Sequence, residues 1–371
     1  MTLAGNLNPA TPATAGTWTS PFGDLSSFAL LGGFPTAAVY GQASVVIGNQ
    51  VFLLGGTTDG TTGRAVTTMV PITGTGVAYA ETPVQRTNAM LQTGRFGATA
   101  LRLSNSFVYL IGGRGSGGAA LNSIEKLHQD SLVTQDSSQF ATAPFSLTQA
   151  RSHHAMAVAG TETAGALTNG RIYVIGGRDS APLTSVEVNT VASGNAGAFA
   201  PAAYSLKVPR YGHAAVVTKK TGDVPAFLYV FGGRGADGDS LGSVERAPLN
   251  ANGDLAGDFE LLAGVSLDDP DNESRGRHGL SAAYVQGRLY LFGGTRSEAG
   301  QARLIDDADH LTIDPETGAV TMIARHHTSF TWGRAYYALA LHGTGNLFVF
   351  GGTPDLPGSG PNPNVERALW R

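Results

Sequence analysis

Short apolar runs that end in two glycines recur along the whole chain. They read VFLLGG from Val51, VYLIGG from Val108, IYVIGG from Ile172, LYVFGG from Leu228, LYLFGG from Leu289 and LFVFGG from Leu347. Each run has the length and composition of one buried β-strand. The runs lie roughly 60 residues apart, which indicates a repeat array of supersecondary units. The doublets predict places where φ is positive or where strands crowd together, because neither tolerates a Cβ.

The segments between the doublets follow one order. A strand of small residues, such as HAAVV from His213, precedes each run, and a strand such as SVERA from Ser243 follows it. A last strand around an aromatic residue completes the unit, marked by Phe140, Phe199 and Phe259. The pattern therefore predicts four short antiparallel strands per unit.

These motifs resemble the kelch family of β-propellers. The resemblance rests on the glycine doublets in register with SVE strands, and on Arg-x-x-His before the first strand, as in RYGHAA from Arg210 and RSHHAM from Arg151. It covers residues 17–371 and implies an all-β, six-bladed kelch-type propeller with four antiparallel strands per blade. We expect residues 1–16 to be a flexible segment and residues 17–371 to form a single domain.

The last unit stops after NVERALWR, so that its fourth strand is missing. In the N-terminal GTWTSPFGDL, Trp18 matches the position of Phe199 and Phe259, and we expect residues near 17–20 to supply the missing outer strand and close the ring. The LLGG at residues 30–33 lacks the flanking strands of a unit, so we expect six blades and not seven.

Charge and cysteine content exclude several classes of protein. The chain has 371 residues and a net charge of −4, which argues against a nucleic-acid partner. No apolar run approaches the roughly 20 residues of a membrane span. The chain has no cysteine, which excludes disulfides and leaves the compartment open, with an extracytoplasmic or secreted protein favoured although no signal peptide is visible. We expect a monomer.

Arginines recur in two loops of each unit that an antiparallel meander brings to one face. We name these the first-strand loop, which leads into the first strand, and the doublet loop, which follows the two glycines. The first-strand loops carry Arg95, Arg151, Arg210, Arg277 and Arg334, and the doublet loops carry Arg114, Arg178, Arg234 and Arg296. Such a ring of guanidinium groups predicts binding of an anionic ligand at the mouth of the central channel.

Structural ion pairs are an alternative explanation for the first-strand arginines. The third strands carry Glu125, Glu187, Glu245, Asp309 and Glu366, and the first unit lacks both partners, with Tyr40 in place of the arginine and Thr68 in place of the acid. We therefore interpret these arginines mainly as paired scaffold. Arg114, Arg178 and Arg234 have no matched acid and are the preferred ligand contacts. The kelch resemblance implies a ligand role for the first-strand arginines as well, so both sets stay candidates.

Histidines and tyrosines vary between units in the first-strand loops. His154 and His213 share one repeat position and are interpreted as structural, whereas His153, Tyr211, His278 and Tyr336 are candidate ligand contacts or, in an enzyme, a general base and acid. The acidic stretches DDPDNE from Asp268 and DGDS from Asp237 do not have the spacing of a calcium loop. No metal and no cofactor are predicted.

Two functions remain open. The first is a recognition module that binds an anionic small molecule, a glycan or an acidic peptide at the arginine-lined mouth. The second is an enzyme of the epimerase, mutarotase or lyase type that acts on an acidic sugar or small carboxylate, with histidine and tyrosine as acid and base and arginine as charge stabiliser. The mutarotase alternative comes from the kelch resemblance, and fold alone does not decide between the two.

Overall fold

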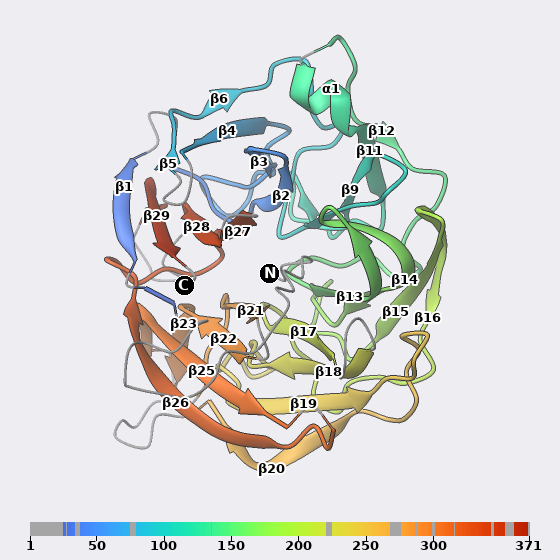
Figure 1. Ribbon diagram of the computed structural model, residues 1–371, viewed down its shortest axis with the longest axis vertical. Helices are drawn as coiled ribbons and strands as arrows, with labels where there is room; N and C mark the ends of the chain where they lie inside the picture. Colours follow the sequence, from blue (N-terminus) through green and yellow to red (C-terminus); the bar gives the residue numbers. More distant parts are fainter. Residues whose placement is uncertain are drawn as a thin grey trace, which may run out of the picture.

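The apolar runs that end in glycine doublets form the second strands of six blades arranged around a central axis (Figure 1). In the computed structural model, the described part of the chain is residues 25–369 apart from residues 27, 34–37, 75–78, 135, 220–224, 268–275, 286–287, 299–300, 315, 343–344 and 353–359. Within each blade the strands pair antiparallel with their neighbours, as predicted.

The first three blades follow one another in the sequence. Blade one contains β2 (Ala43–Ile47), β3 (Gln50–Leu54) and β4 (Thr67–Thr73), with β5 (Tyr79–Ala80) and β6 (Val84–Gln85) both on β4. Blade two contains β8 (Thr99–Arg102), β9 (Phe107–Ile111), β11 (Ile124–His128) and β12 (Ala141–Thr142). Blade three contains β13 (Ala155–Thr163), β14 (Ala166–Ile175), β15 (Val186–Ala192) and β16 (Asn195–Pro201).

The last three blades complete the ring. Blade four contains β17 (Ala214–Lys219), β18 (Pro225–Phe231), β19 (Ser243–Pro248) and β20 (Glu260–Ser266). Blade five contains β21 (Ser281–Val285), β22 (Arg288–Phe292), β25 (Asp307–Ile313) and β26 (Val320–Ser329). Blade six contains β27 (Ala338–His342), β28 (Asn346–Phe350), β29 (Asn364–Leu369) and β1 (Ala29–Gly33).

Short elements lie in the loops between these strands. They are β7 (Arg95–Phe96), β10 (Arg114–Gly115), β23 (Thr295–Glu298), β24 (Gln301–Leu304) and the helix α1 (Gln129–Thr134). In the described part of the chain, no helix is long and apolar enough to cross a membrane.

The hydrophobic core is divided among the six interfaces between neighbouring blades. Each apolar cluster joins residues of two adjacent sheets; the cluster between blades three and four, for example, includes Tyr173, Ile175, Leu228 and Val230. First strands of neighbouring blades are in contact around the axis, as shown by β2 with β8, β13 with β17, β17 with β21 and β27 with β2. The small residues of the first strands allow this close approach, as the sequence pattern predicts.

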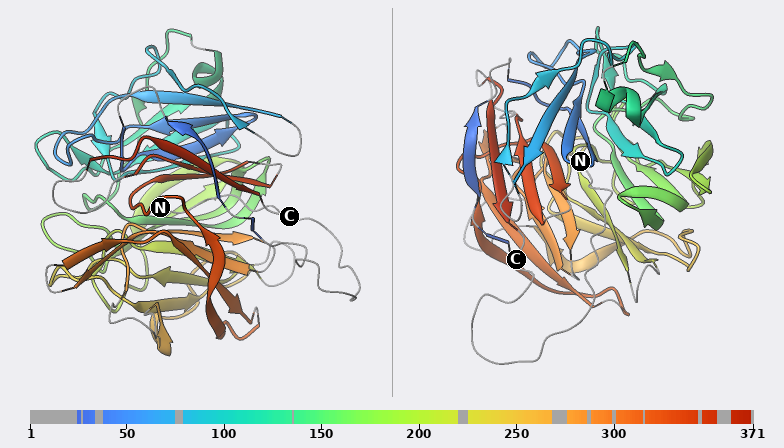
Figure 2. Two further views of the ribbon diagram at one scale, coloured as in Figure 1. Left: turned by 90° about the vertical axis from the view of Figure 1, so that its left-hand side faces the viewer. Right: turned by 45° about the horizontal axis from the view of Figure 1, so that its top comes forward.

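An N-terminal strand closes the ring, but it is not the one predicted. Strand β1 lies beside β29 (Figure 1 and Figure 2) and pairs antiparallel with it. In this pairing Ala29 is opposite Arg367 and Gly33 is opposite Asn364. In the described part of the chain, β28 and β1 pair with the two edges of β29, whereas residues 17–20, expected to supply this strand, lie outside the described residues. Trp18 itself lies outside the described residues.

The aromatic residue of the closing strand is Phe28. Its side chain is 8% exposed and packs against Phe330 and Phe292, with ring centroids at 4.7 and 6.0 Å. Phe140 and Phe259 likewise directly precede the fourth strands of their own blades and are buried. Phe28, and not Trp18, is therefore the counterpart of these residues in blade six.

Both glycines of every doublet adopt the left-handed conformation, with φ of 52° to 68° at the first and 89° to 104° at the second. A Cβ on Gly232 would lie 2.4 Å from the carbonyl oxygen of Arg277 in the next blade. The second glycine, Gly233, donates its N–H to that same oxygen at 2.8 Å. The doublet is thus the point where the backbones of neighbouring blades are hydrogen-bonded, and both predicted reasons for glycine hold.

The tyrosine of the second strand provides a further link between blades. The Tyr173 hydroxyl of blade three donates to the carbonyl of Gly253, in a turn of blade four, at 2.6 Å, and burial raises the pKa of this hydroxyl. We expect Tyr173→Phe to lower the free energy of unfolding by about 1–2 kcal/mol, because the Gly253 carbonyl loses its donor. Urea denaturation checks this, and an unchanged midpoint would contradict it. Phe52 and Phe348 stand at the same repeat position, so the ring itself fits there.

Candidate functional site

In blades one to five, the first-strand loop and the doublet loop are paired on one face of the propeller, as predicted. Ser152 and Arg178 exchange two backbone hydrogen bonds of 2.9 and 2.8 Å, and Tyr211 and Arg234 are bridged in the same way. Further pairs are Tyr40 with Thr57, Phe96 with Arg114 and His278 with Thr295. Thr295, and not Arg296, therefore occupies the arginine position in the doublet loop of blade five. We call this face of the propeller the mouth.

The first-strand arginines form buried ion pairs with the third-strand acids. The pairs are Arg95 with Glu125, Arg151 with Glu187, Arg210 with Glu245, Arg277 with Asp309 and Arg334 with Glu366. In blade four, the Arg210 Nη2 to Glu245 Oε1 distance is 2.7 Å, and Arg210 also donates to the carbonyl oxygens of Gly232 and Ser243. Each arginine thereby ties a first-strand loop to the strands of its own blade.

These interactions do not support a ligand role for the five first-strand arginines. Arg95, Arg151, Arg210, Arg277 and Arg334 are at most 1% exposed. Burial lowers the pKa of Arg210, and the charge of Glu245 opposes that shift. A ligand would have to displace an acid from inside the blade to reach any of these side chains.

One position in blade one needs correction. Val39, and not Tyr40, replaces the first-strand arginine. The Val39 carbonyl accepts the N–H of Gly352, the second doublet glycine of the preceding blade, as the Arg95 carbonyl accepts the N–H of Gly56. Thr68 does stand in the acid position: it pairs with Leu53, as Glu245 pairs with Val230. Blade one therefore lacks both members of the ion pair, as predicted, with Val39 and Thr68 in their places.

Arg114 and Arg178 lie together at the mouth and are both half-buried. Burial, followed by the positive charge of Arg178, lowers the pKa of Arg114, while the Asp179 carboxylate opposes this shift. Arg114 Nη2 donates to the Asp179 carbonyl at 3.1 Å, and the Arg178 guanidinium lies 4.8 Å from the ring centroid of Tyr211. Within the described part of the chain, neither arginine has a carboxylate at ion-pair distance.

The other two doublet-loop arginines are placed differently. The Arg234 Nε donates to the Gly238 carbonyl of its own loop at 2.5 Å. Arg296 is only 8% exposed and lies in β23, where it pairs with Arg303 of β24. Arg114 and Arg178 are therefore the pair that best matches an anion site.

A closed ring of backbone hydrogen bonds surrounds the axis at the mouth. Each blade contributes one residue whose N–H donates to the carbonyl of its counterpart in the preceding blade, at 2.7 to 2.9 Å. These residues are Gly41, Gly97, His153, Gly212, Gly279 and Tyr336, all with φ between 51° and 67°. Sequence reasoning missed this ring, although four glycines at one repeat position were a visible signal.

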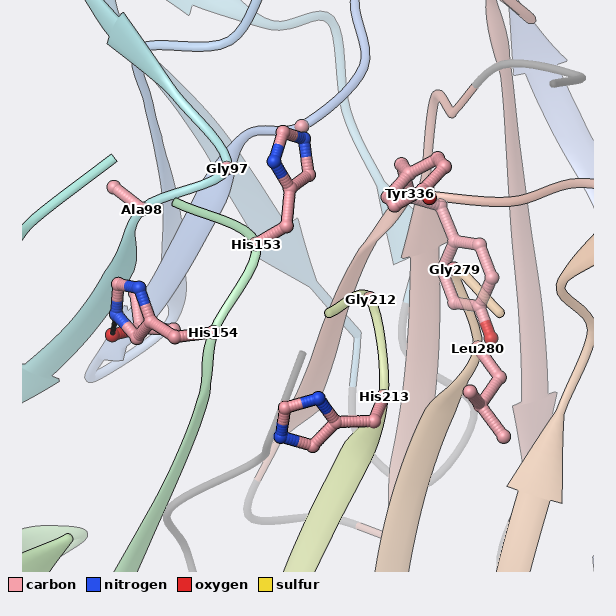
Figure 3. Close-up of a pocket in the computed structure, with 12 residues that line it drawn as sticks. Gly97, Ala98, His153, His154, Gly212, His213, Gly279, Leu280 and Tyr336 are labelled. Carbon is pink, nitrogen blue, oxygen red and sulfur yellow. Dashed lines mark hydrogen bonds between the residues drawn. The ribbon is translucent and has the colours of Figure 1, made fainter. Parts of the chain in front are cut away.

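His153 and Tyr336 are the two side chains that this ring carries, and they meet near the axis (Figure 3). Their ring centroids are 5.3 Å apart with an angle of 78° between the planes. His153 also lies against Phe96 and Tyr211, at 5.7 and 6.4 Å between centroids. His153, Tyr211 and Tyr336 are half-buried, and the ring of His278 also lies against Tyr336, at 6.1 Å between centroids, so the four predicted residues are neighbours.

His278, the fourth candidate, is not exposed at the mouth. Its exposed fraction is 0%, and its Nδ1 lies 2.7 Å from the hydroxyl of Ser240, which in turn accepts the N–H of Ser297. The residue fixes the doublet loop of blade four to that of blade five. The prediction that His278 could act as an acid or base is not supported by this geometry.

His154 and His213 take the structural places expected for them. The His154 Nε2 lies 2.9 Å from the Thr99 hydroxyl, and burial lowers the pKa of both histidines well below the usual value. A Cβ on Gly176 would lie 2.8 Å from His213 Cε1. Burial thus favours the neutral form of both rings, which fill the space between neighbouring blades.

The pocket on the axis is small. It is lined by the ring residues and by residues that follow them into the first strands, among them Ala98, Leu280 and Tyr337, and its volume is about 30 Å³. This holds about two water molecules, far below the volume of an ordinary metabolite site. The described residues contain no cluster of acidic or histidine side chains that could hold a metal ion.

Comparison with known proteins gives support at the level of the fold. No family model and no curated protein matches the sequence. The solved structure of YjhT, a propeller protein, superposes with a TM-score of 0.61 and 13% identity over 91% of this chain and 97% of that one. The kelch resemblance of the repeats thus stays an expectation, while the six-bladed β-propeller fold is shared with a solved structure.

Proposed function

We propose that the protein is a recognition module that binds an anionic ligand at the mouth, with Arg114 and Arg178 as the principal contacts and Arg234 beside them. The observation that carries the proposal is the pair of half-buried guanidinium groups held next to each other. Two like charges in this arrangement repel each other, and an anion between them would relieve that repulsion. A carboxylate or phosphate also matches the planar fork of donors that each arginine presents.

The surroundings of the arginines favour binding over catalysis. His278 is fully buried, and the axial pocket of about 30 Å³ is too small to enclose a substrate. The ligand would therefore lie on the open mouth, as the acidic group of a peptide, a glycan or a small molecule would. The enzyme alternative is left with His153, Tyr211 and Tyr336 as its possible acid and base groups.

A thermal shift experiment tests the proposal. Phosphate or citrate, compared with chloride at equal ionic strength, should raise the melting temperature, because an anion that binds only the folded state stabilises it by mass action. At 100 times the Kd this amounts to about 2.7 kcal/mol. In the variant Arg114→Gln/Arg178→Gln the increase should vanish while the melting temperature without anion changes little.

The double variant Lys126→Gln/Lys207→Gln is the matched control, since it removes two positive charges and leaves Arg114 and Arg178 in place. It should respond to phosphate and citrate as the parent protein does. If the arginine variant retains the full response, or the lysine variant loses it, the proposed site is wrong.

A further inference from the structure

We call the closed ring of backbone hydrogen bonds around the axis the axial ring. Only two blades contribute a residue other than glycine to it. His153 belongs to blade three and Tyr336 to blade six, which lie opposite each other in a ring of six. Both hold φ near 50°, a left-handed conformation that the other four blades fill with glycine. A side chain in this conformation carries a conformational cost, and such costs are concentrated at functional sites.

The glycines beside them leave room for the two rings. A Cβ on Gly97 would lie 2.8 Å from the His153 ring, and a Cβ on Gly279 would lie 3.1 Å from the Tyr336 ring. On Gly212, a Cβ would lie 3.1 Å from the Tyr336 hydroxyl. Both rings therefore lie across neighbouring glycines, and together they cover the axis as one surface, which we call the axial pair.

The axial pair is continuous with the arginines. Its His153 ring contacts Tyr211, whose face is covered by the Arg178 guanidinium, and Arg178 is the neighbour of Arg114. The mouth therefore has positively charged side chains, Arg114 and Arg178, directly beside half-buried aromatic rings. Below the axial pair there is space for little more than water, so a ligand that reaches the axis has to rest on these rings.

We infer that the axial pair of His153 and Tyr336 selects, among the anions held by Arg114 and Arg178, those that carry a planar aromatic ring next to the charged group. This inference rests on the proposed function. The anionic group would lie at the arginines and the aromatic ring on His153, Tyr211 and Tyr336, in the edge or stacked contacts that aromatic rings prefer.

Matched pairs of ligands test the inference. We would titrate the protein with benzoate and acetate, and with phenylphosphonate and methylphosphonate, by calorimetry or NMR. The aromatic member of each pair should bind about tenfold more tightly, the effect expected of one or two good aromatic contacts. In His153→Gly/Tyr336→Gly this ratio should fall to near one, while acetate and methylphosphonate bind as before.

The variants keep the test independent of folding. Glycine is the residue that the other blades use at this position, so the double variant retains a suitable backbone. Tyr336→Phe keeps the ring and should keep the tenfold preference. If the parent binds both members equally, or the glycine variant keeps the preference, the inference is wrong while the anion site stands. If the parent binds none of the four anions, the proposed function fails, and the inference fails with it.

Discussion

Replacing Glu245 by Gln or Arg210 by Met is expected to lower the free energy of unfolding by about 3–5 kcal/mol, because each change leaves a buried partner charge uncompensated. Both side chains are 0% exposed. Glu245 also accepts the N–H groups of Lys207 and Val208, and Arg210 donates to two carbonyl groups of its own blade. One substitution therefore disturbs the first-strand loop, the doublet and the third strand together.

A double-mutant cycle in urea or guanidinium checks this expectation. Arg210→Met/Glu245→Gln should cost less than the sum of the two single changes, with a coupling of at least 1 kcal/mol for residues in direct contact. Lys207→Met, which removes a solvent-exposed ion pair with Asp258, is the control and should change stability little. Small, additive effects of Arg210→Met and Glu245→Gln would mean that the first-strand arginines are not structural.

Phe28→Ala is expected to destabilise the propeller by about 3–5 kcal/mol, the usual range for a large aromatic side chain removed from a core. Phe28 leads into β1 and packs against Phe330 and Phe292 at the interface of blades five and six. Its loss weakens the strand that joins the N-terminal part of the chain to β29. Because this strand closes the ring, the damage affects the whole molecule and not one loop.

Leu30→Ala offers a matched control on the same strand. Leu30 is 49% exposed, so its truncation should change stability by no more than about 0.5 kcal/mol. Thermal and urea unfolding of the two variants would be compared at one pH. Equal effects of Phe28→Ala and Leu30→Ala would contradict the account of ring closure given above.

The repeat pattern predicted most of the fold, because the residues that define each blade lie close together in the sequence. Each doublet must be glycine for the contact it makes with the next blade, so the number of blades is visible in the sequence. The Arg210–Glu245 type of pair was predicted in the same way, since both partners are absent from blade one. Tyr40 was misassigned by one residue, although VYGQ from Val39 matches RYGH from Arg210 and places Val39 in the arginine position.

Other features depend on contacts between distant residues and had no local signal. Trp18 and Phe28 are both aromatic residues ahead of the first blade, and only the packing against Phe330 identifies Phe28. The burial of His278 depends on Ser240 in the doublet loop of another blade. The ring of backbone hydrogen bonds around the axis is different, because its four glycines at one repeat position were a visible signal that sequence reasoning missed.

Anomalous diffraction from crystals soaked in selenate, a phosphate-like anion, tests the central claim most directly. The account predicts a selenium peak at the mouth with its oxygens within about 4 Å of the guanidinium groups of both Arg114 and Arg178, and the loss of that peak in Arg114→Gln/Arg178→Gln. Selenate bound at other places on the protein, with none between these two arginines, would contradict it.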